Sequence, residues 1–210
     1  MIAERSGPGR DAGRFGPWLR STVAVLRDDA EPTVEVPCDG CTACCESVQF
    51  VLVGPDEHDA RAHLPPELLF PAPGAPDGWS VLPYDDRGRC PMLGARGCTV
   101  YEHRPRTCRV YDCRVLAAAG VDPGREKPAI ARRIAEWRFT LDGPDEAAAL
   151  DAVRRAAAFL ADHGDELPHG APPPTQRAAL AVEVHDLFLQ GSPTDPTEVA
   201  VEIGRRLRRA

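Results

Sequence analysis

The stretch CDGCTACC, residues 38–45, places four cysteines within eight residues. Thiolates separated by two residues can bind one metal ion from a single tight turn, and this spacing occurs twice, at Cys38–Cys41 and Cys41–Cys44. Gly40 lies inside the first turn, where a residue without a Cβ eases the backbone bend. Four more cysteines follow along the chain: Cys90, Cys98, Cys108 and Cys113. No cysteine lies outside residues 38–113, and this segregation indicates a local site.

The compartment expected from the sequence favours metal chemistry. The N-terminal residues show no apolar run of signal-peptide length, and no window has the apolar length of a membrane-spanning helix. We therefore expect a cytoplasmic protein without a membrane partner. The cytosol keeps thiols reduced, so clustered cysteines favour metal or redox chemistry over structural disulfides. The net charge of −7 argues against a nucleic-acid partner, and the sequence does not identify a protein partner.

The spacing of the first four cysteines leaves two local geometries open. Cys38, Cys41 and Cys44 match the start of a bacterial [4Fe–4S] ferredoxin run, but the next cysteine is adjacent instead of four positions on. Neighbouring cysteines rarely face the same ion, so Cys44 and Cys45 indicate two directions. A helix would bring Cys38, Cys41 and Cys45 together, whereas a ferredoxin-like loop would use Cys44.

A disulfide scaffold and a catalytic thiol are the alternatives to a metal site. Eight cysteines is an even number, as a disulfide scaffold requires, but export signals are not seen. A catalytic thiol would need a base, and His58, His63 and His103 are available. No recognised nucleophile motif surrounds any cysteine, so the metal-free thiol enzyme is the weaker hypothesis. Whether the protein is an enzyme stays open.

Charge differs between the two cysteine-bearing segments. Residues 38–60 hold five acidic residues and no lysine or arginine, whereas residues 87–114 hold seven arginines against two acids. Arginines close to a thiolate site would offset its negative charge and lower the thiol pKa values. The alternative is that these arginines lie on a solvated face.

The sequence predicts an α+β, mostly α protein with three regions. We expect a disordered N-terminus over residues 1–15, a cysteine-rich metal-binding module with short strands over 16–120, and a helical region over 121–210. Within the module, the residue pattern predicts short elements as follows: a helix over 17–27, a strand over 48–53, a helix over 54–64, a strand over 79–84, and two extended pieces joined by the turn GARG at 94–97.

The C-terminal region shows helical periodicity. Each predicted helix starts at or near a proline, whose missing N–H costs nothing at a helix start. The four predicted segments are 128–141, 144–163, 174–190 and 196–209. In the second, apolar residues recur on one face: Ala149, Leu150, Val153, Ala157 and Leu160.

The two cysteine blocks together resemble a known family. CDGCTACC, followed by CPMLGARGCTVYEHRPRTCRVYDC at residues 90–113, is similar to the YkgJ-like CxxCxxCC cysteine-cluster family of zinc- or iron-chelating domains. The matching positions are Cys38, Cys41, Cys44 and Cys45; Cys90, Pro91 and Leu93; and Cys98, Val100, Tyr101, Glu102, Arg104, Pro105, Cys108 and Arg109. Met92 replaces the aromatic residue usual in the family, and Thr42-Ala43 replaces a frequent glycine. The resemblance covers residues 38–114.

The resemblance implies a site more than a reaction. It implies zinc or iron as the cofactor, with a [4Fe–4S] cluster as one form, because a similar cysteine cluster occurs in a flagellin lysine methylase. No glycine-rich nucleotide fingerprint supports a methyl-donor site here, so the methylase activity is not transferred. It also implies that Arg104 lies near Cys98 and Cys108, while His103 is expected at the surface. The predicted metal ligands are Cys38, Cys41, Cys44, Cys45, Cys90, Cys98, Cys108 and Cys113.

Overall fold

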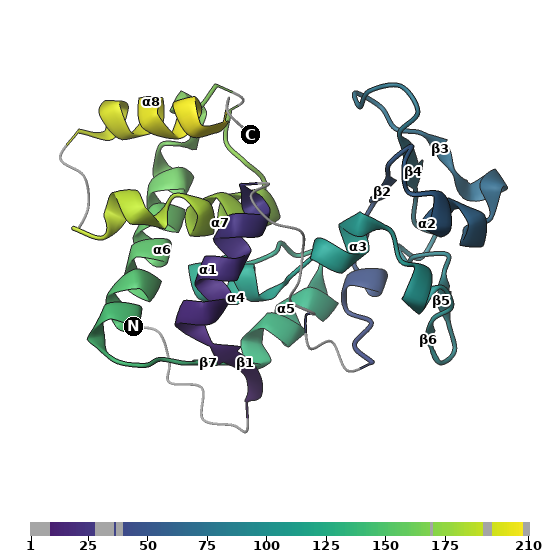
Figure 1. Cartoon of the computed structure of the whole chain (residues 1–210), viewed down its shortest axis with the longest axis horizontal. Coiled ribbons are helices and arrows are strands. Elements are labelled where there is room, and N and C mark those ends of the chain that lie inside the picture. The colour runs from purple at the N-terminus through teal and green to yellow at the C-terminus, as the bar shows by residue number, and fades with distance from the viewer. Residues whose placement is uncertain (1–8, 28–35, 37–39, 169, 191–194, 208–210) are drawn as a thin grey trace. The chain divides into compact units, whose positions relative to one another are not determined.

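The computed structural model describes residues 9–27, 36, 40–168, 170–190 and 195–207. The chain divides into two compact units, whose elements are labelled in Figure 1. The helical unit consists of Met1–Thr33, Cys113–Pro123 and Arg132–Ala210, and the cysteine unit consists of Val34–Asp112 and Gly124–Ala131. These boundaries differ from the expected 16–120 and 121–210, because the first helix and residues 113–123 pack with the C-terminal helices.

The helical unit is built from amphipathic helices that begin where the sequence supplies start signals. Its helices are α1 (Phe15–Leu26), α4 (Arg114–Ala119), α6 (Pro144–Asp162), α7 (Pro174–Glu183) and α8 (Pro196–Leu207), with the 3-10 turns η4 (Gly164–Glu166) and η5 (His185–Phe188). Helix α5 (Pro128–Glu136) begins in the cysteine unit and continues in the helical unit. Proline occupies the first turn of α6 and of α7, as the sequence predicts.

Helix–helix packing gives this unit its core. Helix α6 packs against α7, η5 and α4, and α1 packs against α7; these helices lie side by side in Figure 1. Val153 and Leu160 of the predicted face of α6 are buried. So are Val182 of α7, Phe188 of η5 and Ile203 of α8. Helices thus begin at all four predicted C-terminal starts, but the third ends at Glu183, short of the predicted residue 190.

The sequence did not predict the two strands of the helical unit. β1 (Arg10–Arg14) pairs in parallel with β7 (Trp137–Thr140). The expected disorder over residues 1–15 is thus wrong for residues 10–14, and residues 1–8 lie outside the described residues. The predicted helix over 128–141 ends at Glu136 instead. The ring of Phe139 packs edge-on against Phe15, with ring centroids 5.3 Å apart, which fixes β7 beside the start of α1.

The cysteine unit consists of short elements. Its strands are β2 (Val51–Val53), β3 (Phe70–Pro71), β4 (Ser80–Leu82), β5 (Leu93–Gly94) and β6 (Gly97–Cys98). Its helical turns are η1 (Cys44–Glu46), α2 (His58–His63), η2 (Pro66–Leu68), η3 (Tyr101–His103) and α3 (Arg106–Val110). β2, β4 and β3 form an antiparallel sheet in that order, and β5 and β6 form a hairpin across the predicted turn at 94–97.

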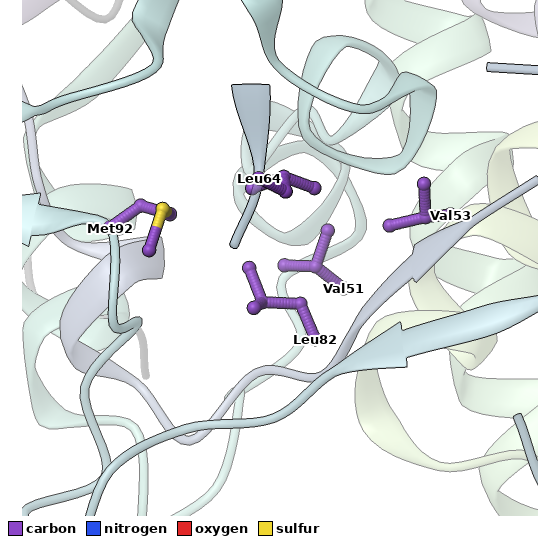
Figure 2. Packing of buried hydrophobic residues seen from close by; sticks show 5 residues of the cluster. All are labelled: Val51, Val53, Leu64, Leu82 and Met92. Atoms are coloured by element: carbon purple, nitrogen blue, oxygen red, sulfur yellow. The ribbon is translucent and has the colours of Figure 1, made fainter. Parts of the chain in front are cut away.

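The core of the cysteine unit is small. Its buried cluster consists of Val51, Val53, Leu64, Leu82 and Met92, which Figure 2 shows as sticks. Val51 and Leu82 are register partners across β2 and β4, and the side chain of Leu64 lies close to both of them in the figure. Three of the predicted ligands, Cys90, Cys98 and Cys108, pack against this cluster while remaining only partly buried. Helices predominate over strands in the chain as a whole, so the predicted α+β, mostly α class is confirmed.

Candidate metal centre

The opening cysteine stretch adopts tight turns. Gly40 has a φ of +71°, in the left-handed region that glycine favours. The Ala43 N–H donates to the Cys41 sulfur at 3.5 Å. One of the two geometries considered for residues 38–45 was a helix. Within the described residues 40–45, the helical structure is the 3-10 turn η1, which begins at Cys44. Cys38 lies outside the described residues.

Backbone hydrogen bonds bring the second cysteine block to the first. The Cys90 N–H donates to the Cys45 carbonyl oxygen at 2.7 Å, so residues from the two blocks are direct neighbours. In the β5–β6 hairpin, Cys98 pairs with Leu93, so the chain returns toward the segment that holds Cys90. The Cys108 N–H, at the start of α3, donates to the Pro105 carbonyl oxygen at 2.9 Å. Cys108 also packs, with Cys90 and Cys98, against the buried cluster of Val51, Val53, Leu64, Leu82 and Met92.

The thiols converge closely enough to change one another's acidity. A hydrogen bond from the Cys45 side chain lowers the pKa of Cys44 to about 7, and Arg104 adds to the decrease. The same bond raises the pKa of Cys45, and burial and the charges of Cys44, Cys90 and Cys98 raise it further. The pair therefore favours one thiolate and one thiol.

Burial is the largest influence on the pKa values of Cys90 and Cys108. Burial raises the pKa of Cys108 to about 12, and the charges of Cys44, Cys90 and Cys98 add to the increase. Burial also raises the pKa of Cys90, with contributions from Cys98 and Cys44. Each thiolate thus opposes ionisation of the others, because like charges repel in a partly buried site. A bound cation would reverse this repulsion, since a coordinating thiol is deprotonated by the metal.

Arg104 supplies positive charge to the same locus. Its charge lowers the pKa of Cys44 and opposes the increase at Cys108. The guanidinium carbon lies 3.5 Å from the ring centroid of Tyr101, and Nε donates to the Tyr101 carbonyl oxygen at 2.6 Å. Arg109 in turn donates to the Arg104 carbonyl oxygen at 2.9 Å. These contacts hold one arginine of the basic segment beside the thiols, as the Arg-Pro motif implies.

The sulfur spacing bears on the kind of metal. In a tetrahedral zinc site with Zn–S bonds of about 2.3 Å, neighbouring sulfurs lie about 3.8 Å apart. Among the described residues, no three cysteine sulfurs lie within 4.8 Å of one another. A [4Fe–4S] cluster spreads its four thiolates over a larger cube than a zinc tetrahedron.

Cys113 has a different environment from the other described cysteines. It belongs to the helical unit, whereas Cys41, Cys44, Cys45, Cys90, Cys98 and Cys108 belong to the cysteine unit. The indole Nε1 of Trp137 donates to its sulfur at 3.1 Å. The cysteine at position 113 therefore has a protein hydrogen-bond donor in its own unit.

A second group of ligand-type side chains lies in the cysteine unit. Asp59, His63 and His103 have ligand atoms that all lie within 4.8 Å of one another. The sequence pointed to the two histidines as bases for a thiol and gave Asp59 no role. The available signal was the four-residue spacing of Asp59 and His63 in a predicted helix, which places both on one face.

Comparison with known proteins agrees with the cysteine pattern. Residues 37–121 match the model of the family CxxCxxCC, described as "Putative zinc- or iron-chelating domain". This confirms the family resemblance of the two cysteine blocks. The comparisons with curated proteins and with solved structures found no match. Within the described residues, no helix combines the length and the apolar character needed to span a membrane.

Proposed function

We propose that residues 37–121, which match the family of zinc- or iron-chelating domains, bind a metal centre through converging cysteine thiolates. One observation carries the proposal. A backbone hydrogen bond of 2.7 Å joins Cys45 to Cys90, and the charges of Cys44, Cys90 and Cys98 raise the pKa of Cys108, although some forty residues separate the two blocks. Partly buried thiols without a structural disulfide form a donor set that suits soft or borderline ions.

The proposed ligands are all eight cysteines, with different support. Five of them rest on mutual proximity: Cys44, Cys45, Cys90, Cys98 and Cys108. Cys41 rests on its two-residue spacing to Cys44 and on the N–H that faces its sulfur. Cys38 rests on spacing alone, and Cys113 on its place within the matched residues 37–121. More thiols than one zinc ion needs are available, so the set suits a cluster or more than one ion.

An iron–sulfur centre is the second candidate, because the chain offers more thiols than one zinc ion needs and its first three cysteines have the spacing that starts a ferredoxin run. The protein's contribution would be the same in both cases. It would supply thiolates from three segments, the positive charge of Arg104, and a partly buried setting beside Met92 and Leu82. A bound centre of this kind would give redox chemistry, and zinc would give a structural or storage role.

Anaerobic purification with elemental analysis and a visible spectrum distinguishes these candidates. Colourless protein with stoichiometric zinc supports zinc chelation. Brown protein with stoichiometric iron and acid-labile sulfide supports the iron–sulfur centre. Metal-free protein that reacts with one equivalent of a thiol reagent at Cys44 would overturn the proposal in favour of a thiol enzyme.

Substitutions test the ligand set. Cys90→Ser and Cys108→Ser are expected to lose most of the metal, because each removes a thiolate from the converging group. Thr99→Ala is the matched control, since it changes the same hairpin region without removing a thiol and is expected to keep wild-type metal content. Cys113→Ser tests the cysteine that belongs to the helical unit. Full metal content in that variant would restrict the ligands to cysteines of the cysteine unit. Wild-type metal content in both Cys90→Ser and Cys108→Ser would contradict the proposal.

A further inference from the structure

We infer that Asp59, His63 and His103 form a second metal site, which takes a divalent transition-metal ion through nitrogen and oxygen donors and is distinct from the thiol set. All three residues lie in the cysteine unit. Helix α2 supplies Asp59 and His63, which are one turn apart on the same face. The 3-10 turn η3 supplies His103, and α2 and η3 pack against each other.

The spacing of the donor atoms is the first argument. His103 Nδ1 lies 2.9 Å from Asp59 Oδ2 and 3.2 Å from Oδ1. His63 Nδ1 lies 3.7 Å from Asp59 Oδ1 and 2.9 Å from the backbone carbonyl oxygen of Asp59. Donor atoms that share one ion at about 2.0–2.2 Å, in tetrahedral or octahedral geometry, lie about 3.0–3.5 Å apart. The three side chains therefore already have close to the mutual spacing that a shared ion imposes.

The stacking of the two imidazole rings is the second argument. The rings of His63 and His103 are parallel within 3°, with centroids 3.4 Å apart. The contact keeps the two side chains together beside Asp59, whose carboxylate lies 2.9 Å from Nδ1 of His103 and 3.7 Å from Nδ1 of His63. The stack therefore holds the three side chains together before an ion binds.

The carboxylate supplies the negative charge that a cation needs. The hydrogen bond with His103 keeps the pKa of Asp59 below its ordinary value, with weaker help from the charges of His63 and Arg109. The side chains of Asp59, His63 and His103 are 67%, 42% and 38% exposed, so a bound ion keeps room for water ligands. Arg109 is the nearby positive group and limits the affinity. The site is thus an open one, of weaker affinity than a closed thiolate site.

The donor chemistry selects the class of ion. Imidazole nitrogen suits Zn²⁺, Cu²⁺, Ni²⁺ and Fe²⁺, whereas Mg²⁺ and Ca²⁺ prefer an all-oxygen set. Thiolates are softer ligands than this mixed set. The two sites therefore differ in preference, and an ion that saturates the thiols leaves the second site available for a separate titration.

Titration of the full chain with Ni²⁺ tests the inference. The protein is used with the metal that it retains on purification, and binding is followed by calorimetry. His63→Ala and His103→Ala are each expected to weaken Ni²⁺ binding at least about tenfold. His58→Ala is the matched control, because His58 is exposed on the same helix but outside the group, and wild-type affinity is expected. Equal affinity in wild type, His63→Ala and His103→Ala would overturn the inference.

A measurement on the unmodified protein gives an independent test. Paramagnetic Ni²⁺ at substoichiometric amounts is expected to broaden the ring signals of His63 and His103 in nuclear magnetic resonance spectra before those of His58, His163 and His185. Uniform broadening of all histidines, or broadening of His58 first, contradicts the site. Metal content of the thiol set is measured in parallel by elemental analysis, so failure of one site does not obscure the other.

Discussion

The helical unit and the cysteine unit reach order in different ways. The helical unit contains the 19-residue helix α6 and a core of side chains that are almost fully buried, such as Leu160, Val182 and Phe188. The longest helix wholly within the cysteine unit is α2, with six residues. Its buried cluster is completed by partly buried cysteines. A region with so little apolar burial gains less hydrophobic free energy to offset its conformational entropy.

Polar groups take over part of the role of a core in the cysteine unit. The Arg61 guanidinium donates to the carbonyl oxygens of Gly54 and Gly78 at 2.7 Å each, and to the Ser80 hydroxyl at 3.1 Å. The Asp85 carboxylate accepts from the backbone N–H groups of residues 87 and 89 at 2.9 Å each. These bonds fix loops but give modest net stability, because folding exchanges them for bonds to water. The difference between the units therefore predicts that the folded state of the cysteine unit depends on a bound metal.

The largest expected effect comes from removing the metal. Metal binding supplies on the order of 10–16 kcal/mol of apparent folding free energy in zinc-finger peptides, and the cysteine unit has a similarly small core. Chelation is expected to speed amide exchange in β2, β4 and α3 by more than about a hundredfold, because their folded state loses this contribution. Amides of α6 and α7 are expected to keep their protection. Hydrogen exchange with and without chelator measures both units at once. Retained protection in β2 and β4 would contradict the prediction that the cysteine unit depends on metal more than the helical unit does.

A core truncation tests the opposite unit. Leu160 is 1% exposed, and Leu160→Ala is expected to lower the free energy of unfolding of the helical unit by about 2–5 kcal/mol through lost burial and a cavity. Metal content should stay near the wild-type level, because all the described thiols except that of Cys113 lie in the cysteine unit. Urea unfolding, followed through the fluorescence of Trp18 and Trp137 in a Trp79→Phe background, measures the free energy of unfolding of the helical unit. Leu189→Ala is the control, since Leu189 is 43% exposed and its truncation is expected to cost little.

Elements with local signals were predictable from the sequence, and elements with distant partners were not. Helices α6, α7 and α8 begin at Pro144, Pro174 and Pro196, where proline and apolar spacing act within one segment. Strand β7 was predicted as helix, because its pairing partner β1 lies more than a hundred residues earlier in the chain. Local helical periodicity over 128–141 gave no sign of this pairing. Tertiary contacts therefore decided the structure there.

The candidate site shows the same division. Spacing and family resemblance identified the cysteines as candidates, since two-residue spacing is a local property. The convergence of Cys44 with Cys108 depends on how α3 and the β5–β6 hairpin fold, and no local pattern encodes it. The group of Asp59 and His103 was missed for the same reason, because it forms only when η3 packs on α2. Whether all eight cysteines bind metal stays a prediction.

A smaller effect is expected from a polar crosslink in the cysteine unit. Arg61→Lys keeps the charge but loses the forked guanidinium that reaches four acceptors, the carbonyl oxygens of residues 53, 54 and 78 and the Ser80 hydroxyl. We expect a loss on the order of 2 kcal/mol, because carbonyl acceptors are left without a charged donor. Exchange of the β2 and β4 amides in metal-loaded protein measures it. Arg87→Ala removes an exposed arginine of the same unit and should change exchange by less than about 0.5 kcal/mol. Equal effects of the two variants would show that the hydrogen bonds of Arg61 add no more stability than an exposed arginine does.

The smallest expected effect is a pH-dependent ion pair in the helical unit. Partial burial alone would raise the pKa of Asp186, but two hydrogen bonds of 2.8 Å from Arg206 and the charge of Arg27 lower it below its ordinary value. A carboxylate with a lowered folded-state pKa stabilises the protein above its unfolded pKa of about 3.9, and the contribution is lost as the pH falls further. The Asp186 side chain is 41% exposed, so solvent screening limits the contribution to about 1 kcal/mol or less. Asp186→Asn should therefore destabilise the helical unit at pH 7, and its difference from wild type should shrink as the pH falls through the lowered folded-state pKa. Asp151→Asn on the exposed face of α6 should have a smaller effect throughout. Urea unfolding of metal-free protein between pH 7 and about pH 2 measures this, and a difference that does not shrink with falling pH would mean that Asp186 acts through packing instead of charge.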